Sequence, residues 1–202
     1  MLDIGANIGW YTLTLGKEGY NVISFEPSKI NYYILLKSYC LNQDINVTII
    51  NKGLDNVEKN MTLYHPLDDT GNGVAFDGKD LLNFTNPIKE EITLNKLDYY
   101  IEFLKSKNLA LIKIDVEGSE GKVIEGGLDL IVKYHIPFIF MEWQSNYLKL
   151  KGTDPKLFLK MFESNGYKFS KKDFISKQYI SIEDLLKESR INIFVVYDKF
   201  LN

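Results

Sequence analysis

Cysteine and histidine are scarce in this chain of 202 residues, which contains one cysteine and two histidines. The single cysteine, Cys40, excludes an intrachain disulfide, and it also excludes a cysteine-built metal site, which needs several thiolates. The two histidines, His65 and His135, lack the close spacing that is typical of metal ligands. The sequence therefore predicts no dedicated metal site, and the lack of disulfides is typical of a reducing compartment such as the cytoplasm.

Long apolar runs and a strong charge of one sign are also absent. No run approaches the roughly 20 apolar residues that span a bilayer, and the N-terminus lacks the charged and apolar regions of a signal peptide. A net charge of −3 argues against broad binding to a nucleic-acid backbone, which usually needs a basic surface. The hydrophobic fraction of 45% is typical of a globular protein, and the length suits a single domain over residues 1–202.

Short apolar segments and helix-like segments alternate along most of the sequence. Continuous apolar strands separated by helices predict a mostly parallel α/β sheet with helices on both faces. Residues 55–95 are different, because they contain a cluster of turn formers at 68–73, and we expect an irregular excursion there apart from a strand at Met61–Tyr64. The other expected strands are Leu2–Ile4, Val22–Phe25, Val47–Ile50, Leu111–Val116, Pro137–Trp143 and Ile191–Tyr197, and the expected helices are Gly9–Glu18, Ser28–Leu41, Leu97–Lys107, Ser119–Lys133 and Asp154–Asn165.

A glycine-containing segment, Asp3-Ile4-Gly5-Ala6-Asn7-Ile8-Gly9, follows the first expected strand. Glycine lets the backbone approach a ligand closely, and the start of the next helix offers N–H groups to a carboxylate or phosphate. A dinucleotide-binding loop would have glycine at the positions of Gly5, Asn7 and Trp10, and only the first of these matches. This mismatch disfavours a nucleotide-binding oxidoreductase, which stays as an alternative.

The second expected strand ends in an acidic residue, Glu26, about 20 residues after Gly5, where a carboxylate accepts hydrogen bonds from two ribose hydroxyls. We expect Asp3 to lie near a ligand ammonium group and the helix start near a ligand carboxylate. The ordered set Asp3, Gly5, Asn7, Gly9 and Glu26 therefore favours a nucleoside that carries an amino acid. In the alternative interpretation, Asp3 caps the turn, the glycines only form it, and Glu26 is solvated.

A third block, Lys113-Ile114-Asp115-Val116-Glu117-Gly118-Ser119-Glu120, ends the fourth strand of the expected sheet. Together with the segment from Asp3 to Thr12 and with Phe25-Glu26-Pro27, it resembles the FkbM family of methyltransferases, over residues 2 to about 143. The resemblance implies a Rossmann-like, seven-stranded methyltransferase sheet with an antiparallel final hairpin. It also implies S-adenosylmethionine as the methyl donor, and a segment ahead of the first strand, so we expect the N-terminus to be shortened.

Methyl transfer to a hydroxyl requires a group that accepts the hydroxyl proton. Asp115, at the end of the fourth strand, is the first candidate for this base, and we also assign it to donor binding. Glu142 is the second candidate and His65 the third, although a surface histidine in a loop fits His65 equally well. Paired carboxylates at neighbouring strand ends could also hold a divalent cation. Glu120 is interpreted as charge compensation at a helix N-terminus. For Glu117, which also ends the fourth strand where we expect the acceptor to enter, this charge compensation is the alternative interpretation.

These features predict an S-adenosylmethionine-dependent methyltransferase that methylates a hydroxyl of a sugar or a similar small molecule, with a small-molecule or glycan acceptor as its partner. Two alternatives stay open. One is a non-catalytic module that keeps the fold, which a shortened N-terminus favours, and the other is the oxidoreductase. A shortened N-terminus is also compatible with a homo-oligomer in which a second copy covers the donor site.

Overall fold

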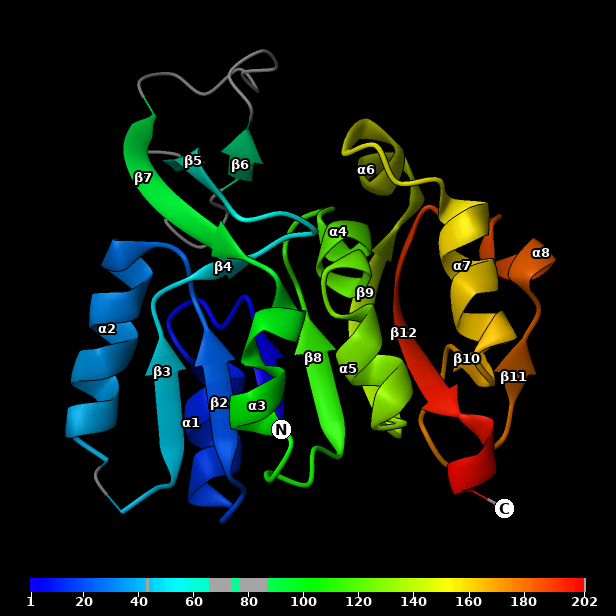
Figure 1. Cartoon of the computed structure of the whole chain (residues 1–202), viewed down its shortest axis with the longest axis horizontal. Coiled ribbons are helices and arrows are strands. Elements are labelled where there is room, and N and C mark those ends of the chain that lie inside the picture. The colour runs from blue at the N-terminus through cyan, green and yellow to red at the C-terminus, as the bar shows by residue number, and fades with distance from the viewer. Residues whose placement is uncertain (43, 66–73, 77–86, 202) are drawn as a thin grey trace. The chain divides into compact units, whose positions relative to one another are not determined.

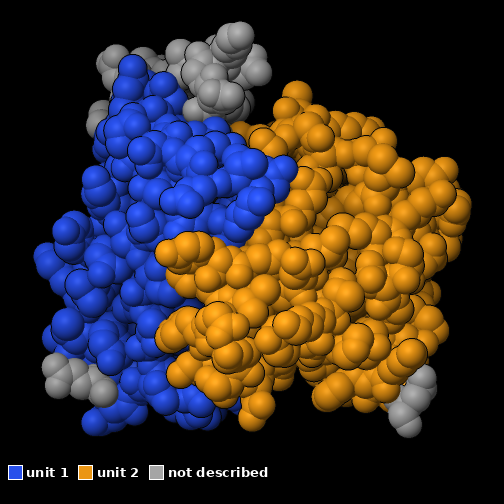
Figure 2. Space-filling model, viewed as in Figure 1, with its two compact units in different colours: residues 1–96 blue, residues 97–202 orange. Residues whose placement is uncertain are grey.

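The computed structural model describes residues 1–42, 44–65, 74–76 and 87–201 (Figure 1). The chain divides into two compact units, Met1–Lys96 and Leu97–Asn202 (Figure 2). Each unit is built from both strands and helices, as the alternating sequence pattern indicates. A single domain over residues 1–202 stays a prediction.

The first unit begins with three parallel strands, β1 (Leu2–Ile4), β2 (Val22–Phe25) and β3 (Val47–Ile50), in the order β1-β2-β3. Helix α1 (Trp10–Lys17) connects β1 to β2, and helix α2 (Lys29–Cys40) connects β2 to β3 (Figure 1). Parallel neighbours need such crossover connections, and strands β1 and β2 are buried along their whole length. The predicted strands and helices of this part are confirmed.

Residues 53–65, 74–76 and 88–95 form a second sheet in the first unit. Its strands are β4 (Gly53–Leu54), β5 (Lys59–His65), β6 (Val74–Phe76) and β7 (Ile88–Asn95), in the order β4-β7-β5-β6. The expectation of an irregular excursion over residues 55–95 is therefore wrong for the part that the structure describes, and the turn cluster at 68–73 lies outside it.

The two long strands of this second sheet, β5 and β7, alternate between polar and apolar residues, as antiparallel strands with one solvated face do. In β5 and β7, which pair antiparallel, the inward side chains Leu63, Ile92 and Leu94 form a small apolar cluster with Met61 packed against it. The intervening residues are mostly charged or polar, so neither segment has the continuous apolar run of a buried parallel strand. Only Met61–Tyr64 was predicted, and it lies within β5.

The second unit contains five strands, β8 (Leu111–Ile114), β9 (Phe138–Gln144), β10 (Tyr167–Ser170), β11 (Tyr179–Ile180) and β12 (Arg190–Tyr197), in the order β8-β9-β12-β10-β11. Strands β8 and β9 are parallel, whereas β12 is antiparallel to both β9 and β10. The predicted antiparallel end of the sheet is confirmed. Apart from the four strands of the second sheet, the described residues form eight strands where seven were expected, and the two-residue β11 is a short addition at the edge.

Two expected helices of the second unit, Leu97–Lys107 and Ser119–Lys133, are shorter or divided, whereas the expected helix Asp154–Asn165 is confirmed as α7 (Pro155–Ser164). The expected helix Ser119–Lys133 is two helices, α4 (Glu120–Glu125) and α5 (Leu128–Lys133), separated by Gly126 and Gly127. A Cβ atom on Gly127 would lie 2.6 Å from the side chain of Leu97, so this glycine is required by packing. The other helical segments are η2 (Leu97–Tyr100), α3 (Ile101–Leu104), α6 (Ser145–Leu150), α7 (Pro155–Ser164), α8 (Ile182–Leu185) and η3 (Asp198–Phe200).

The first residues of two expected helices, Ser28 and Asp154, are N-caps in the structure. The Ser28 hydroxyl accepts a hydrogen bond from the Asn31 N–H at the start of α2, and the Asp154 carboxylate accepts from Lys156 and Leu157 at the start of α7. None of the helices within the described part of the chain has both the length and the hydropathy needed to cross a membrane.

Candidate functional site

The turn between β1 and α1 is held by the backbone of the neighbouring strand. The N–H groups of Gly5 and Ala6 both donate to the Phe25 carbonyl, at 3.0 and 3.1 Å. Gly5, Asn7 and Gly9 all have positive φ angles, of 75°, 53° and 95°. Three such residues within five positions make the sharp turn that carries the chain from the end of the strand into the helix.

Packing and backbone conformation both explain why one of these residues is glycine. A Cβ atom on Gly9 would lie 2.1 Å from the Cδ1 atom of Leu35 on α2, and its φ of 95° also favours glycine. Asn7 tolerates its positive φ because its side-chain oxygen accepts the Ile8 N–H at 2.7 Å. The turn therefore has a structural basis of its own, which does not depend on a ligand.

Glu26 follows β2, and its carboxylate joins two segments of the first unit. Oε2 accepts the Asn7 N–H at 2.7 Å, and Oε1 accepts the Ser28 N–H at 2.9 Å. The side-chain amide of Asn51 donates to the carbonyls of Glu26 and Pro27, at 2.8 and 3.1 Å. Glu26 is only 5% exposed, so the interpretation of this residue as solvated is wrong. Its side chain is turned toward the glycine turn.

Asp3 is completely buried at the centre of strand β1. The Thr12 hydroxyl donates to Asp3 Oδ2 at 2.6 Å and also lies 2.7 Å from the hydroxyl of Ser24 on β2. This polar chain links β1, α1 and β2 beneath the glycine turn. A contact between Asp3 and a ligand ammonium group stays a prediction.

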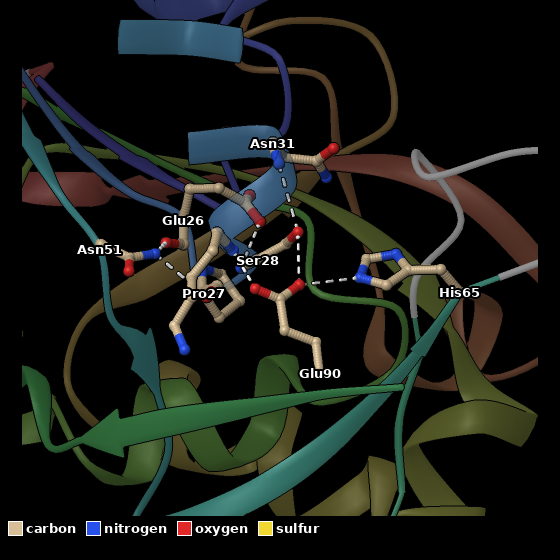
Figure 3. A network of polar contacts seen from close by, with 8 residues as sticks. Glu26, Pro27, Ser28, Asn31, Asn51, His65 and Glu90 are labelled. Atoms are coloured by element: carbon tan, nitrogen blue, oxygen red, sulfur yellow. Dashed lines mark hydrogen bonds and ion pairs between the residues drawn. The ribbon is translucent and has the colours of Figure 1, made fainter. Parts of the chain in front are cut away.

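His65, the last residue of β5, is fully buried and does not lie in a surface loop. Its Nε2 atom is 3.3 Å from Oε2 of Glu90 on β7 (Figure 3). Glu90 also accepts the Ser28 hydroxyl at 2.9 Å and the Lys29 N–H. No local sequence pattern indicates this role for Glu90, because its partner Ser28 is 62 positions away along the chain.

In the second unit, the third sequence block forms a turn after β8. Asp115 is half-exposed, and its Oδ2 atom is 3.6 Å from Nζ of Lys113, whose side chain is almost completely buried. Glu117 and Gly118 are both left-handed, with φ angles of 51° and 93°. A Cβ atom on Gly118 would lie 2.6 Å from Cβ of Tyr147, so this turn packs closely against α6.

The charges of neighbouring side chains shift the pKa of one carboxylate in the second unit. Burial raises the pKa of Glu117, and the negative charges of Asp115 and Glu142 raise it further, against the opposing effects of Arg190 and Lys113. Glu142, on β9, forms an ion pair with Arg190 at 2.6 Å between Oε1 and Nε. The structure thus brings the predicted residues Asp115 and Glu142 into one electrostatic cluster with Glu117, which the sequence pattern also places at the end of the fourth strand.

The buried side chain of Glu120 accepts hydrogen bonds from the backbone of this turn. Its Oε1 atom accepts the N–H groups of Val116 and Gly118, at 3.1 and 3.2 Å. Glu120 is 1% exposed, and burial raises its pKa to about 7. Within the described part of the chain, its Oε2 atom has no hydrogen-bond partner.

Comparison with known proteins identifies the family. The model of the FkbM methyltransferase domain matches residues 3–169. The chain belongs to the FkbM methyltransferase domain family. The resemblance of the three sequence blocks is thereby confirmed, and the blocks that contain Glu26 and Asp115 lie inside the matched region.

Solved structures show where the fold of this FkbM domain recurs. The methyltransferase FkbM from Methylobacillus flagellatus KT matches with a TM-score of 0.56 and 19% identity, over 98% of this chain and 43% of that one. A protein in the NADB-Rossmann superfamily from Streptococcus agalactiae matches with a TM-score of 0.50 and 12% identity, over 96% and 60%. The chain therefore spans less than two thirds of either structure. No curated protein gives a significant match. These similarities confirm the Rossmann-like methyltransferase fold.

A metal site finds no support in the part of the FkbM domain that is described. Among residues 1–42, 44–65, 74–76 and 87–201, no three His, Cys, Asp or Glu side chains are arranged to hold a metal ion. The cluster of Asp115, Glu117 and Glu142 is balanced by Lys113 and Arg190.

Proposed function

We propose that this FkbM domain binds S-adenosylmethionine and methylates a hydroxyl group of a sugar or a similar small molecule. Family membership supports methyl transfer as the reaction class. The observation that carries donor binding is the hydrogen bond from the Asn7 N–H to the Glu26 carboxylate, because it places the acidic residue of the second strand against the glycine turn. Both features belong to one compact unit.

The residues of the first unit fit an adenosyl amino acid. An ionised carboxylate has about four acceptor positions, and the N–H groups of Asn7 and Ser28 take two of those on Glu26. The donor's two ribose hydroxyls are neutral donors that such a carboxylate orients. The N–H groups of residues 5–9 already have acceptors in the first unit, so the start of α1 is the part that presents backbone N–H groups suited to the donor's carboxylate. Asp3 supplies negative charge toward the donor's ammonium group.

S-adenosylmethionine supplies a methyl group on a positively charged sulfur, and the acceptor hydroxyl must lose its proton as the methyl group is transferred. We propose the carboxylates of Asp115, Glu117 and Glu142 for this role. A base works best when its pKa lies near the working pH, and the raised pKa of Glu117 moves it in that direction. His65 is fully buried and paired with Glu90, so we assign it a positioning role and not that of a base.

Calorimetric titration tests donor binding. We expect the wild-type chain to bind S-adenosylmethionine and S-adenosylhomocysteine. Glu26→Ala should raise both Kd values by about tenfold or more, because hydrogen bonds to a charged group are lost. Glu18→Ala, which replaces an exposed glutamate at the end of α1, is the matched control. Equal affinity of Glu26→Ala and the wild type for these ligands would refute the proposed contact between Glu26 and the ribose. NAD is titrated in the same way to test the oxidoreductase alternative.

Transfer of a labelled methyl group to a panel of glycans tests the reaction itself. The proposal is supported if the wild-type chain forms labelled product with any hydroxyl acceptor and if Asp115→Asn or Glu117→Gln no longer forms it. Donor binding without transfer to any acceptor would favour the non-catalytic module instead. Transfer to nitrogen or carbon acceptors alone would overturn the assignment to hydroxyl oxygen.

A further inference from the structure

We propose that Glu90, on strand β7 of the second sheet, is a positioning residue for the donor's ribose, which acts through Ser28 on Glu26. This inference rests on the proposed function, because it assigns the second sheet a role in donor binding. The contacts lie within the first unit, and Figure 3 shows them around the start of α2.

Ser28 is the residue that the two carboxylates share. Its N–H donates to Glu26 Oε1 at 2.9 Å, and its hydroxyl donates to Glu90 Oε2 at 2.9 Å. Glu90 also accepts the N–H of the next residue, Lys29. The backbone that fixes one oxygen of Glu26 is therefore itself fixed by Glu90.

The charge of Glu90 suits this position. Helix α2 spans 12 residues, and its first N–H groups carry partial positive charge, which favours a carboxylate close by. The Glu90 side chain is only 9% exposed, so water competes little for these hydrogen bonds. Removal of its charge would loosen the first turn of α2, where Ser28 holds Glu26.

His65 fixes Glu90 in turn. It is fully buried on the neighbouring strand β5, and its Nε2 atom lies 3.3 Å from Glu90 Oε2. Strands β5 and β7 pair over seven positions, from Lys59 opposite Leu94 to His65 opposite Ile88. The paired strands thus present His65 and Glu90 as a preset pair to the start of α2.

Orientation of Glu26 matters because a carboxylate that binds two adjacent ribose hydroxyls must present both oxygens at once. Oε2 is set by the Asn7 N–H and Oε1 by the Ser28 N–H. A misplacement of about 1 Å can cost a factor of a hundred in enzymatic rates, and binding geometry is sensitive for the same reason. Loss of the Glu90 contacts should therefore weaken the binding of ligands that carry ribose hydroxyls and leave unchanged the binding of ligands that lack them.

The experiment compares two ligands, S-adenosylhomocysteine and its 2′,3′-dideoxy analogue, by calorimetry at fixed pH. We expect Glu90→Gln to raise the Kd of S-adenosylhomocysteine about tenfold, a value within the range found for residues that orient a binding group, and to change the Kd of the dideoxy analogue less than twofold. In a Glu26→Gln background, the Glu90→Gln change should have almost no further effect.

Glu91→Gln is the matched control. Glu91 is adjacent on β7, accepts a hydrogen bond from Thr62 on the exposed side and should leave both Kd values unchanged. Ser28→Ala provides a second test, which leaves the Ser28 N–H in place but removes the hydroxyl, with its contact to Glu90 and its cap on the Asn31 N–H. This variant should raise the Kd of S-adenosylhomocysteine more than that of the dideoxy analogue, by a smaller factor than Glu90→Gln does. Circular dichroism of each variant confirms that the fold is retained.

Three results would overturn the inference. Unchanged affinity in both Glu90→Gln and Ser28→Ala would show that Glu90 does not act on the ribose. Equal loss for both ligands, or additive effects of Glu90→Gln and Glu26→Gln, would show a general structural role. A wild-type chain that binds neither ligand would overturn the proposed donor itself, which distinguishes that failure from the first two.

Discussion

Glu120 offers the sharpest prediction about stability, because a carboxyl group is buried there with a pKa of about 7 against an ordinary value of 4.5. Hydrogen bonds from Val116 and Gly118 lower this pKa, but the cost of burying a charge raises it more. The folded state therefore binds the Glu120 proton more tightly than the unfolded state does.

The sign of the pH dependence follows from this difference. Between pH 4.5 and 7, Glu120 is protonated in the folded chain and ionised in the unfolded chain, so its contribution to stability falls as the pH rises. Each pKa unit corresponds to about 1.4 kcal/mol, and the shift of roughly 2.5 units gives a total loss of about 3 kcal/mol by pH 8. Below pH 4.5 the contribution is fully present.

Glu120→Gln removes the titrating group and keeps the shape of the side chain. The amide oxygen can accept the N–H groups of Val116 and Gly118, as Oε1 does in the wild type. The variant should match the wild type near pH 4.5 to 5 and exceed its free energy of unfolding by about 3 kcal/mol at pH 8.

Urea unfolding followed by circular dichroism between pH 5 and 8 measures this difference. Glu125→Gln, at the exposed end of the same helix, is the control and should follow the wild-type curve. Parallel pH profiles for Glu120→Gln and the wild type would refute the assignment of a neutral buried carboxyl. A profile with the opposite slope would show that the two N–H bonds outweigh burial.

Three further predictions concern the glycine turn, the start of α5 and the coupling between Asp115 and Glu117. Gly9→Ala should lower the free energy of unfolding by about 2 kcal/mol or more in urea, since its Cβ would lie 2.1 Å from Leu35 at a φ of 95°; a neutral result would contradict the packing of α1 on α2. Asp98→Ala removes the carboxylate that accepts two N–H groups at the start of α5 and should cost about 1 kcal/mol, measured the same way. Asp115→Asn should lower the pKa of Glu117, followed by NMR of its side-chain carboxyl, because the Asp115 charge raises that pKa; an unchanged titration would separate the two residues.

The split of the helix expected at Ser119–Lys133 shows how tertiary contacts change a local pattern. The sequence pattern suggested one helix through Gly126 and Gly127. The structure ends α4 at Glu125 and starts α5 at Leu128, and the Asp98 carboxylate supplies the new cap. Asp98 is about 30 positions away, so no local window of sequence includes the residue that caps α5.

Several strands and helix caps of the FkbM domain were predictable from local physical chemistry. The strands at Leu2–Ile4 and Val22–Phe25 were predictable because fully buried parallel strands need continuous apolar residues. The helix caps at Ser28 and Asp154 were predictable because a short polar side chain satisfies N–H groups two or three residues ahead. The order of the three motif blocks indicated the family, since each block follows the end of a strand.

Only the tertiary structure decided which groups surround the acidic residues. Glu26 meets the N–H of Asn7, Glu90 meets His65 and the start of α2, and Glu117 lies in the field of Glu142. Burial and the pKa of a carboxyl depend on atoms from several segments that are distant in sequence, whereas the strands β1 and β2 and the caps at Ser28 and Asp154 depend on neighbours along the chain. The sequence by itself therefore determined these elements and the motif blocks. Folding determined the second sheet, the division of the helix at Gly126 and Gly127, and the surroundings of the acidic side chains.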